Sequence, residues 1–180
     1  MKEDYISNEQ NRKLLSKIRT GFMEEDRYIT AIISIPRPSH DLFPLVEYED
    51  KKGILLIKRK QNPAKGLIWC LGGGQKRGYV VRESLINLIK NECDLNIYDL
   101  TYLGGEPEDL FWDKDAFGHG KGVHDLAMPF FARTKGELKL NDVHTDPLIV
   151  NYESFSNIKE NLHWYIQKYT EKALNLAFGK

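Results

Sequence analysis

The sequence has few of the features that mark an extracellular, membrane or metal-clustered protein. It contains two cysteines, Cys70 and Cys93, which are too few and too embedded in apolar sequence for a disulfide framework or a zinc site. No apolar run approaches the length that crosses a membrane, and the first ten residues lack the basic and apolar parts of a secretory signal. We therefore expect a cytoplasmic protein.

The charges show no excess of either sign. The 180 residues include 26 basic and 26 acidic side chains, so neither nucleic acid nor a membrane surface is an expected partner. Apolar residues make up 41% and aromatic residues 11%, which is typical of a folded globular chain. The length predicts a single domain, 1–180, with an N-terminal helical extension over 1–25 and a C-terminal helix over 157–177.

Apolar patterns and turn residues outline the elements between these ends. Residues 28–35 are rich in β-branched side chains and predict a strand, which is followed by a loop as far as Pro44. Residues 125–132 predict a buried strand in which Pro129 marks an edge or a bulge. Strands before and after one strong helix, with helices at both termini, indicate an α/β or α+β fold.

That helix belongs to the most informative stretch, residues 69–95. The glycines at 72–74 follow an apolar run and predict either a turn or a place where another group approaches the backbone closely. From Val80 onward, apolar residues recur at the spacing of one helix face. Glu92 continues that face in the last turn, where the helix dipole disfavours a carboxylate. Glu92 is therefore either a solvated residue at a fraying end or a ligand for a hard cation such as Mg²⁺.

This stretch resembles a degenerate Nudix box, the signature of hydrolases that act on nucleoside diphosphates linked to another group. The complete signature has a glutamate after the glycine loop, an Arg-Glu pair in the helix, two adjacent glutamates and a glycine. Only Glu92 keeps the residue of the signature. The other positions hold Tyr79, Asn87, Leu88, Asn91 and Asp94.

The choice of signature residues that are replaced resembles one branch of that superfamily, the GDP-mannose mannosyl hydrolases. The similarity covers about two thirds of the chain, roughly residues 52 to 174. The residues that match are Lys58, Arg59, Pro63, Ala64, Gly66, Gly72, Gly73, Glu92, Leu95 and His124. Further on, Asp142, His144 and Asp146 resemble the loop that carries the catalytic histidine of that branch.

The resemblance implies a fold, a reaction and a set of site residues. The fold is a mixed β-sheet between helices, an α/β/α sandwich. The reaction is attack of water on the sugar C1 of a nucleotide sugar, with one Mg²⁺ at the diphosphate. The implied residues are His144 as the base, Glu92 and the Gly72 carbonyl as metal ligands, and Arg59, Gly73 and His124 around the diphosphate. A homodimer is an open alternative to a monomer.

Departures from that branch keep two other activities open. Val143 stands where the branch has a metal-binding glutamine, and Gly74 and Asn87 stand where it has arginines. Leu110 replaces a loop histidine, and Asp125 replaces an aromatic residue after His124. The alternatives are a Nudix enzyme that attacks phosphorus, which usually relies on several box carboxylates, and a catalytically impaired protein that binds nucleotide sugars.

Overall fold

The computed structural model describes residues 17, 24–115, 120–141 and 144–179. The elements are α2 (Glu25–Ser34), β1 (Arg37–Tyr48), β2 (Lys51–Arg59), β3 (Ile68–Trp69), β4 (Leu71–Gly74), α3 (Val81–Cys93), β5 (Asn96–Tyr102), β6 (Glu108–Trp112), β7 (Val123–Lys135), β8 (His144–Val150), α4 (Tyr152–Ile158), the 3₁₀ helix η2 (Lys159–Asn161) and α5 (Trp164–Phe178). The long helix predicted within 69–95 is α3.

In the described part of the chain, eight strands form one mixed sheet. Its main order is β3-β2-β1-β7-β5, and β4, β6 and β8 pair with β1, β7 and β2 respectively. The central strands β1 and β7 run parallel over nine register pairs, from Arg37 opposite Asp125 to Leu45 opposite Arg133. All other pairs are antiparallel. The mixed sheet is the one expected.

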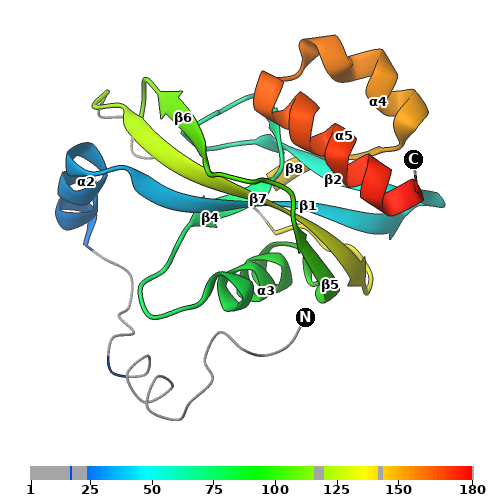
Figure 1. Ribbon diagram of the computed structural model, residues 1–180, viewed down its shortest axis with the longest axis horizontal. Coiled ribbons are helices and arrows are strands. Elements are labelled where there is room, and N and C mark those ends of the chain that lie inside the picture. The colour runs from blue at the N-terminus through cyan, green and yellow to red at the C-terminus, as the bar shows by residue number, and fades with distance from the viewer. Residues whose placement is uncertain (1–16, 18–23, 116–119, 142–143, 180) are drawn as a thin grey trace.

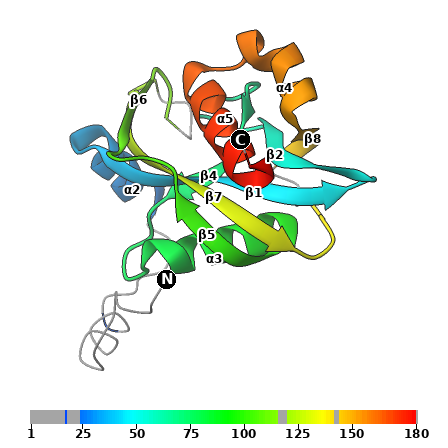
Figure 2. The same ribbon diagram turned by 45° about the vertical axis from the view of Figure 1, so that its right-hand side comes forward.

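Helices cover both faces of this sheet, as Figures 1 and 2 show. Figure 1 places α3 on one side and α4 and α5 on the other, with α2 beside the end of the sheet where β1 begins. Figure 2 shows the same two layers of helix from a second direction. The predicted α/β/α arrangement is therefore confirmed. Within the described residues, no helix is long and apolar enough to cross a membrane.

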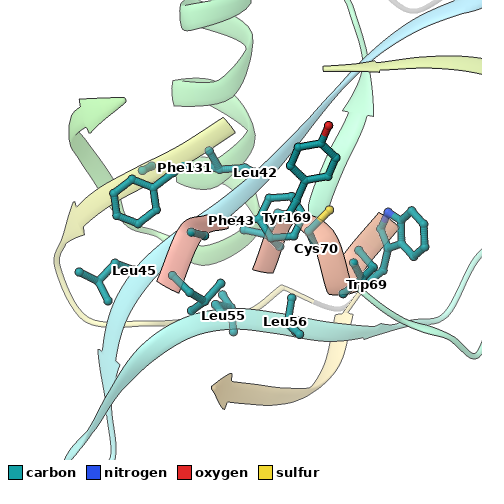
Figure 3. Close-up of a cluster of buried hydrophobic side chains, with 14 of the residues drawn as sticks. Leu42, Phe43, Leu45, Leu55, Leu56, Trp69, Cys70, Phe131 and Tyr169 are labelled. Carbon is teal, nitrogen blue, oxygen red and sulfur yellow. The ribbon is translucent and has the colours of Figure 1, made fainter. Parts of the chain in front are cut away.

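The core lies on both faces of β1 and β2, because helices cover the sheet from both sides. All eight residues from Ser39 to Val46 are buried, as are all five from Gly53 to Ile57. Continuous burial of this kind is expected where a sheet has no solvent face. Figure 3 shows part of this core, where Phe43 and Tyr169 pack with ring centroids 6.2 Å apart, between β1 and α5.

The strand predicted over residues 28–35 is wrong, because this segment forms helix α2. Glu25 and Asp26 lie in the first turn, where the helix dipole favours carboxylates. Ile35 precedes Pro36 and has an extended backbone, as a residue before proline prefers, so the helix ends there. Packing of Ile32 against the rest of the protein outweighs the β-propensity of the branched side chains.

Three prolines lie inside strands at positions where a strand changes its partner. Pro44 falls between the part of β1 that pairs with β4 and the part that pairs with β2, so the predicted loop as far as Pro44 is instead strand β1. Pro38 lies one residue beyond the β4 ladder and accepts a hydrogen bond from Gln75 N at 2.9 Å. Pro129 lies between the β6 and β5 pairings of the internal strand β7, and not at an edge of the sheet. Proline has no N–H to donate, so these breaks in the ladder tolerate it.

The C-terminal helix begins later than predicted. Residues 152–161 form α4 and η2, and Leu162 has an extended backbone that separates them from α5. His163 then caps α5 by accepting a hydrogen bond from Tyr165 N at 3.3 Å. The helix continues to Phe178, so the predicted range 157–177 is correct only from Trp164 onward. The predicted N-terminal helical extension lies almost wholly outside the described residues.

Candidate functional site

A cleft of about 170 Å³ opens on the face of the sheet that α5 covers. Six strands and the loop after β2 contribute to it. It is lined by Arg37, Ser39, Asp41, Arg59, Gln61, Asn62, Pro63, Ala64, Trp69, Gly72, Gly73, Leu110, Trp112 and Asp125. Three residues proposed from the sequence, Arg59, Gly72 and Gly73, are therefore brought together.

The glycines of this cleft lie in a strand, so a turn at 72–74 is wrong, whereas the alternative of a close approach to the backbone is confirmed at Gly72. Strand β4 pairs with β1 and places Gly72 opposite Asp41 and Gly73 opposite His40. A Cβ atom at Gly72 would lie 2.1 Å from Asp41 Oδ1, so the missing side chain makes room for this carboxyl. A Cβ atom at Gly73 would meet only Leu88 Cδ1, at 4.0 Å. The two glycines therefore have different roles.

Asp41 is a buried acid in this cleft that the sequence did not single out. Burial raises its pKa to about 6, against the opposing influence of the nearby Tyr165 hydroxyl and the charge of Arg59. Its inward direction follows from its place on β1, because Arg37, Ser39 and Asp41 alternate with residues that face the other side. The signal in the sequence was polar residues at every second position, hidden because this segment was predicted as a loop.

Arg59 is the last residue of β2 and brings an unpaired hydrogen-bond donor into the cleft. Its Nε is buried and has no hydrogen-bond partner among the described residues. The backbone on either side is fixed by hydrogen bonds from Arg59 N to Leu67 O at 3.0 Å and from Gly66 N to Arg59 O at 2.8 Å. The loop they close supplies Asn62, Pro63 and Ala64 to the cleft wall. A positioned guanidinium with unused donors is suited to an oxyanion such as phosphate.

A second arginine lies in the cleft within a closed hydrogen-bond network. Arg37 donates from Nε and Nη2 to the two carboxylate oxygens of Asp125, at 2.6 and 2.8 Å. Its Nη1 donates to the Tyr28 hydroxyl at 2.8 Å, which ties α2 to β1. The indole Nε1 of Trp112 donates to Asp125 at 3.1 Å. Asp125 therefore holds both an arginine and an aromatic wall of the cleft in place.

His144 is the first residue of β8, where the sequence predicted a loop. Its backbone lies opposite Arg59 in the pairing of β8 with β2. The chain before His144 lies alongside the end of α3. Two hydrogen bonds join them, from Lys139 N to Cys93 O and from Asn141 N to Glu92 O, both 3.0 Å. The fold thus places the backbone of His144 beside Arg59 and the backbone of Asn141 beside Glu92. Asp142 and Val143 lie outside the described residues.

His124 does not line the cleft that contains Arg59. It alternates with Asp125 on β7 and faces away from the cleft, where its ring stacks on Phe111 with centroids 4.6 Å apart. Its Nε2 lies 2.7 Å from Asp109 Oδ1. His124 and Phe111 border a second, more open cleft of about 420 Å³ beside the end of α2. The placement of His124 gives no support to its predicted contact with the diphosphate.

The described residues contain no cluster of three side chains of the kinds that most often bind metal ions. Nowhere in the described ranges do three histidine, cysteine, aspartate or glutamate side chains come together as a ligand group. Gly72 lines the cleft, whereas Glu92 is half-buried at the end of α3 and does not line it. A magnesium ion takes six oxygen ligands, so these two residues would leave most positions to water and to a bound ligand.

The comparisons with known proteins rest on structure. No protein-family model matches the chain, and no curated protein matches it in sequence. The NUDIX domain of Shewanella oneidensis NrtR, solved with ADP ribose, superposes with a TM-score of 0.59 at 13% identity, over 86% of this chain and 99% of that one. The MutT protein of Methanosarcina mazei gives a TM-score of 0.57 at 17% identity, over 81% and 98%. The chain has a Nudix fold.

A third structure extends the same likeness. The Ap4A hydrolase of C. elegans gives a TM-score of 0.53 at 16% identity, over 80% of this chain and 99% of that one. At these identities the likeness concerns the fold. Within this Nudix fold, α3 is the helix of the box-like segment, and Asp94 follows it in the left-handed conformation, with φ 54°. Asp94 forms an ion pair with Lys90.

Proposed function

We propose that this protein is a Nudix hydrolase of nucleoside-diphosphate sugars, GDP-mannose-like in its substrate, and that it releases nucleoside diphosphate and free sugar. The observation that carries the proposal is the unpaired Nε of Arg59 in the cleft, next to the backbone of Gly72 and Gly73. A guanidinium beside side-chain-free backbone suits a diphosphate, which needs donors and close approach. The proposed location is the cytoplasm.

The structural neighbours support a ligand of this class. One neighbour was solved with ADP ribose, and another is named as an Ap4A hydrolase. In both compounds phosphoanhydride-linked phosphates join a nucleoside to a second group, as in a nucleotide sugar. The GDP-mannose assignment within that class rests on the resemblance of residues 52–174 to the mannosyl hydrolases.

The proposed reaction breaks the bond between the sugar C1 and the oxygen of the β-phosphate. The oxygen of water attacks C1, His144 accepts the proton of that water, and the diphosphate leaves with the electron pair of the C1–O bond. Arg59 stabilises the negative charge that the leaving diphosphate gains. Mg²⁺ would add positive charge at the same phosphates. We propose that Glu92 and the Gly72 carbonyl contact it only when the nucleotide brings further oxygen ligands.

One observation favours a second candidate, a protein that binds nucleotide sugars without cleaving them. The metal-binding positions of the box are lost at Asn91 and Leu88, and no ligand group of three acidic, histidine or cysteine residues assembles in the described chain. Attack at phosphorus is less well supported than either, since it usually relies on several of those carboxylates.

A panel of nucleotide sugars separates these activities. The protein is incubated with GDP-mannose, UDP-glucose and ADP-ribose, with Mg²⁺ and with chelator, and the products are separated by chromatography. The proposal predicts Mg²⁺-dependent release of nucleoside diphosphate from at least one sugar. Release of nucleoside monophosphate indicates attack at phosphorus, and binding without any product indicates the binding protein.

The role of Arg59 has a matched control on the same strand. Lys58 precedes it, is exposed and does not line the cleft. Arg59→Leu should weaken GDP binding by about 10- to 100-fold, the value of a hydrogen-bonded charge, whereas Lys58→Leu should change it little. Calorimetry measures both. Equal effects of the two changes would mean that the cleft is not the diphosphate site.

A further inference from the structure

One wall of the cleft is aromatic and packs against a histidine. Trp69 and Trp112 line the cleft and pack edge-on, with ring centroids 5.2 Å apart at an angle of 73°. The imidazole of His163 lies against both indoles, with its centroid 5.2 Å from that of Trp69 and 6.0 Å from that of Trp112. His163 does not itself line the cleft, so it acts on the cleft through these two side chains.

The same histidine is the N-cap of α5. Its Nδ1 accepts a hydrogen bond from Tyr165 N at 3.3 Å, so Nδ1 carries no proton and the neutral ring keeps its proton on Nε2. Tyr165 is fully buried and stacks on Trp69, with ring centroids 5.6 Å apart and the rings 13° from parallel. The cap therefore fixes the first turn of α5 against the wall that His163 also contacts.

A second proton on the ring would remove this cap. Both nitrogens of an imidazolium are donors, so the charged ring cannot accept a hydrogen bond from Tyr165 N. Its charge would also lie at the positive end of the helix dipole. Burial lowers the pKa of His163 below its ordinary value of 6.5, and no neighbouring charge among the described residues contributes to this shift. The cap is therefore intact at neutral pH and is lost under acidic conditions.

Two carboxyl groups also border these rings. Asp125 accepts a hydrogen bond from Trp112 Nε1 at 3.1 Å, and Asp41 lies near the Tyr165 hydroxyl. The pKa of Asp41 is raised to about 6, so Asp41 too gains a proton in mild acid. That proton removes a buried charge and stabilises the folded protein, whereas a proton on the capping histidine destabilises it. The nearby Cys70 thiol has a pKa raised by burial and stays protonated.

We propose that His163 is a positioning residue for the cleft, and that a proton on its Nδ1 releases both the start of α5 and the aromatic wall, so that acid weakens ligand binding. Trp69 and Trp112 share the cleft with Arg59, where we place the diphosphate. The effect on a ligand thus rests on the proposed function. The effect on the wall and on the helix does not.

The tryptophans of the chain provide a direct readout. The sequence contains three, Trp69, Trp112 and Trp164, and the ring centroid of each lies within 6.0 Å of that of His163. Tryptophan fluorescence of the ligand-free protein is followed from about pH 5 to pH 8, the range in which histidine titrates. Calorimetry with GDP and Mg²⁺ at both ends of this range measures binding.

The key variant is His163→Asn, because asparagine is a strong N-cap that does not titrate. His163→Ser caps in the same way and serves as a second variant if the first fails to fold, which thermal melts establish. The control is His124→Asn, since His124 stacks on Phe111 and does not line the cleft.

The unaltered protein and His124→Asn should show a fluorescence transition with a midpoint below pH 6.5. The variants at position 163 should lack it. Acid should weaken GDP binding about 3- to 10-fold more in the unaltered protein than in His163→Asn, the effect of a lost hydrogen bond. The comparison between proteins removes the titration of GDP itself and of Asp41, which both proteins share.

Three results would overturn the inference. A transition that persists in both variants at position 163 would belong to another group, such as Asp41. A midpoint above pH 6.5 would mean that the indoles attract the imidazolium more strongly than burial disfavours it. An equal loss of GDP affinity in the unaltered protein and His163→Asn would show that the wall does not affect the ligand. Failure of every protein to bind GDP would instead contradict the proposed function, and the fluorescence would still decide the role of His163.

Discussion

The carboxyl group of Asp41 occupies the space that a side chain at position 72 would need. The two residues lie opposite each other on β1 and β4, and a Cβ atom at Gly72 would be 2.1 Å from Asp41 Oδ1. This contact explains why a glycine stands in the middle of a strand, where it costs stability. It also places a buried acid next to the backbone that we propose to bind the diphosphate.

Substitution of the two neighbouring glycines tests that contact. Gly72→Ala should destabilise the protein by about 1–3 kcal/mol, the usual range for overpacking, because the methyl group displaces Asp41. Gly73→Ala is the control, because its methyl group would lie 4.0 Å from the nearest atom, Leu88 Cδ1. Urea unfolding measures both. Equal stability of the two variants would contradict the account.

The acid at position 41 should make stability depend on pH. Burial raises the pKa of Asp41 from 3.8 to about 6, so the folded protein binds more protons than the unfolded chain between these values. The stability that Asp41 gives is thus fully present below pH 4 and is lost as the pH rises through 6. A shift of about two pKa units corresponds to about 3 kcal/mol.

Comparison with Asp41→Asn isolates this effect from that of other groups. Burial lowers the pKa of His40 below 6.5, so its contribution has the opposite sign and is lost as the pH falls. Both proteins contain His40, so the difference between their urea stabilities at pH 4 and pH 7 reports Asp41 alone. We expect Asp41→Asn to gain relative stability toward pH 7. A constant difference would show that Asp41 titrates normally.

The metal should bind together with the nucleotide. Glu92 and the Gly72 carbonyl are too few ligands to hold Mg²⁺ alone, whereas a diphosphate supplies further oxygens. Calorimetry should detect little Mg²⁺ binding to the free protein and clear binding in the presence of GDP, and Glu92→Gln should abolish this coupling. GDP binding that is the same with Mg²⁺, with chelator and in Glu92→Gln would favour the binding protein.

His144 is the proposed base, and its replacement should affect the rate more than binding. His144→Gln removes the proton acceptor, so turnover of GDP-mannose should fall by roughly 10²–10⁴. The affinity for GDP should stay nearly constant, because His144 acts on water and not on the diphosphate. Steady-state rates and GDP titrations measure the two quantities. Unchanged turnover would assign His144 to a structural role in β8.

The parts of the fold that the sequence predicted correctly are those with strong local patterns. Helix α3 follows from its apolar spacing and begins within one residue of the predicted start. Helix α2 was mistaken for a strand because its branched side chains favour a strand locally, while its packing depends on distant residues. Pro129 suggested an edge or a bulge. It lies inside the sheet where β7 changes partner from β6 to β5, and these pairings cannot be read from β7 alone.

The residues of the candidate site were also predicted only in part. Arg59, Gly72 and Gly73 were selected through resemblance to a known motif, and the cleft contains all three. Asp41 and Arg37 were missed because their importance depends on the β1–β4 and β1–β7 pairings, which join segments far apart in the chain. Glu92 and His144 remain predictions, and their roles depend on the experiments above.

The reaction in ¹⁸O-labelled water tests the central claim most directly. The protein is incubated with GDP-mannose and Mg²⁺ in labelled water, and the products are analysed by mass spectrometry. Attack at the sugar C1 predicts one ¹⁸O atom in the released mannose and none in GDP. Label in a nucleotide phosphate would contradict the claim and establish attack at phosphorus, and the absence of any product despite GDP binding would contradict hydrolysis altogether.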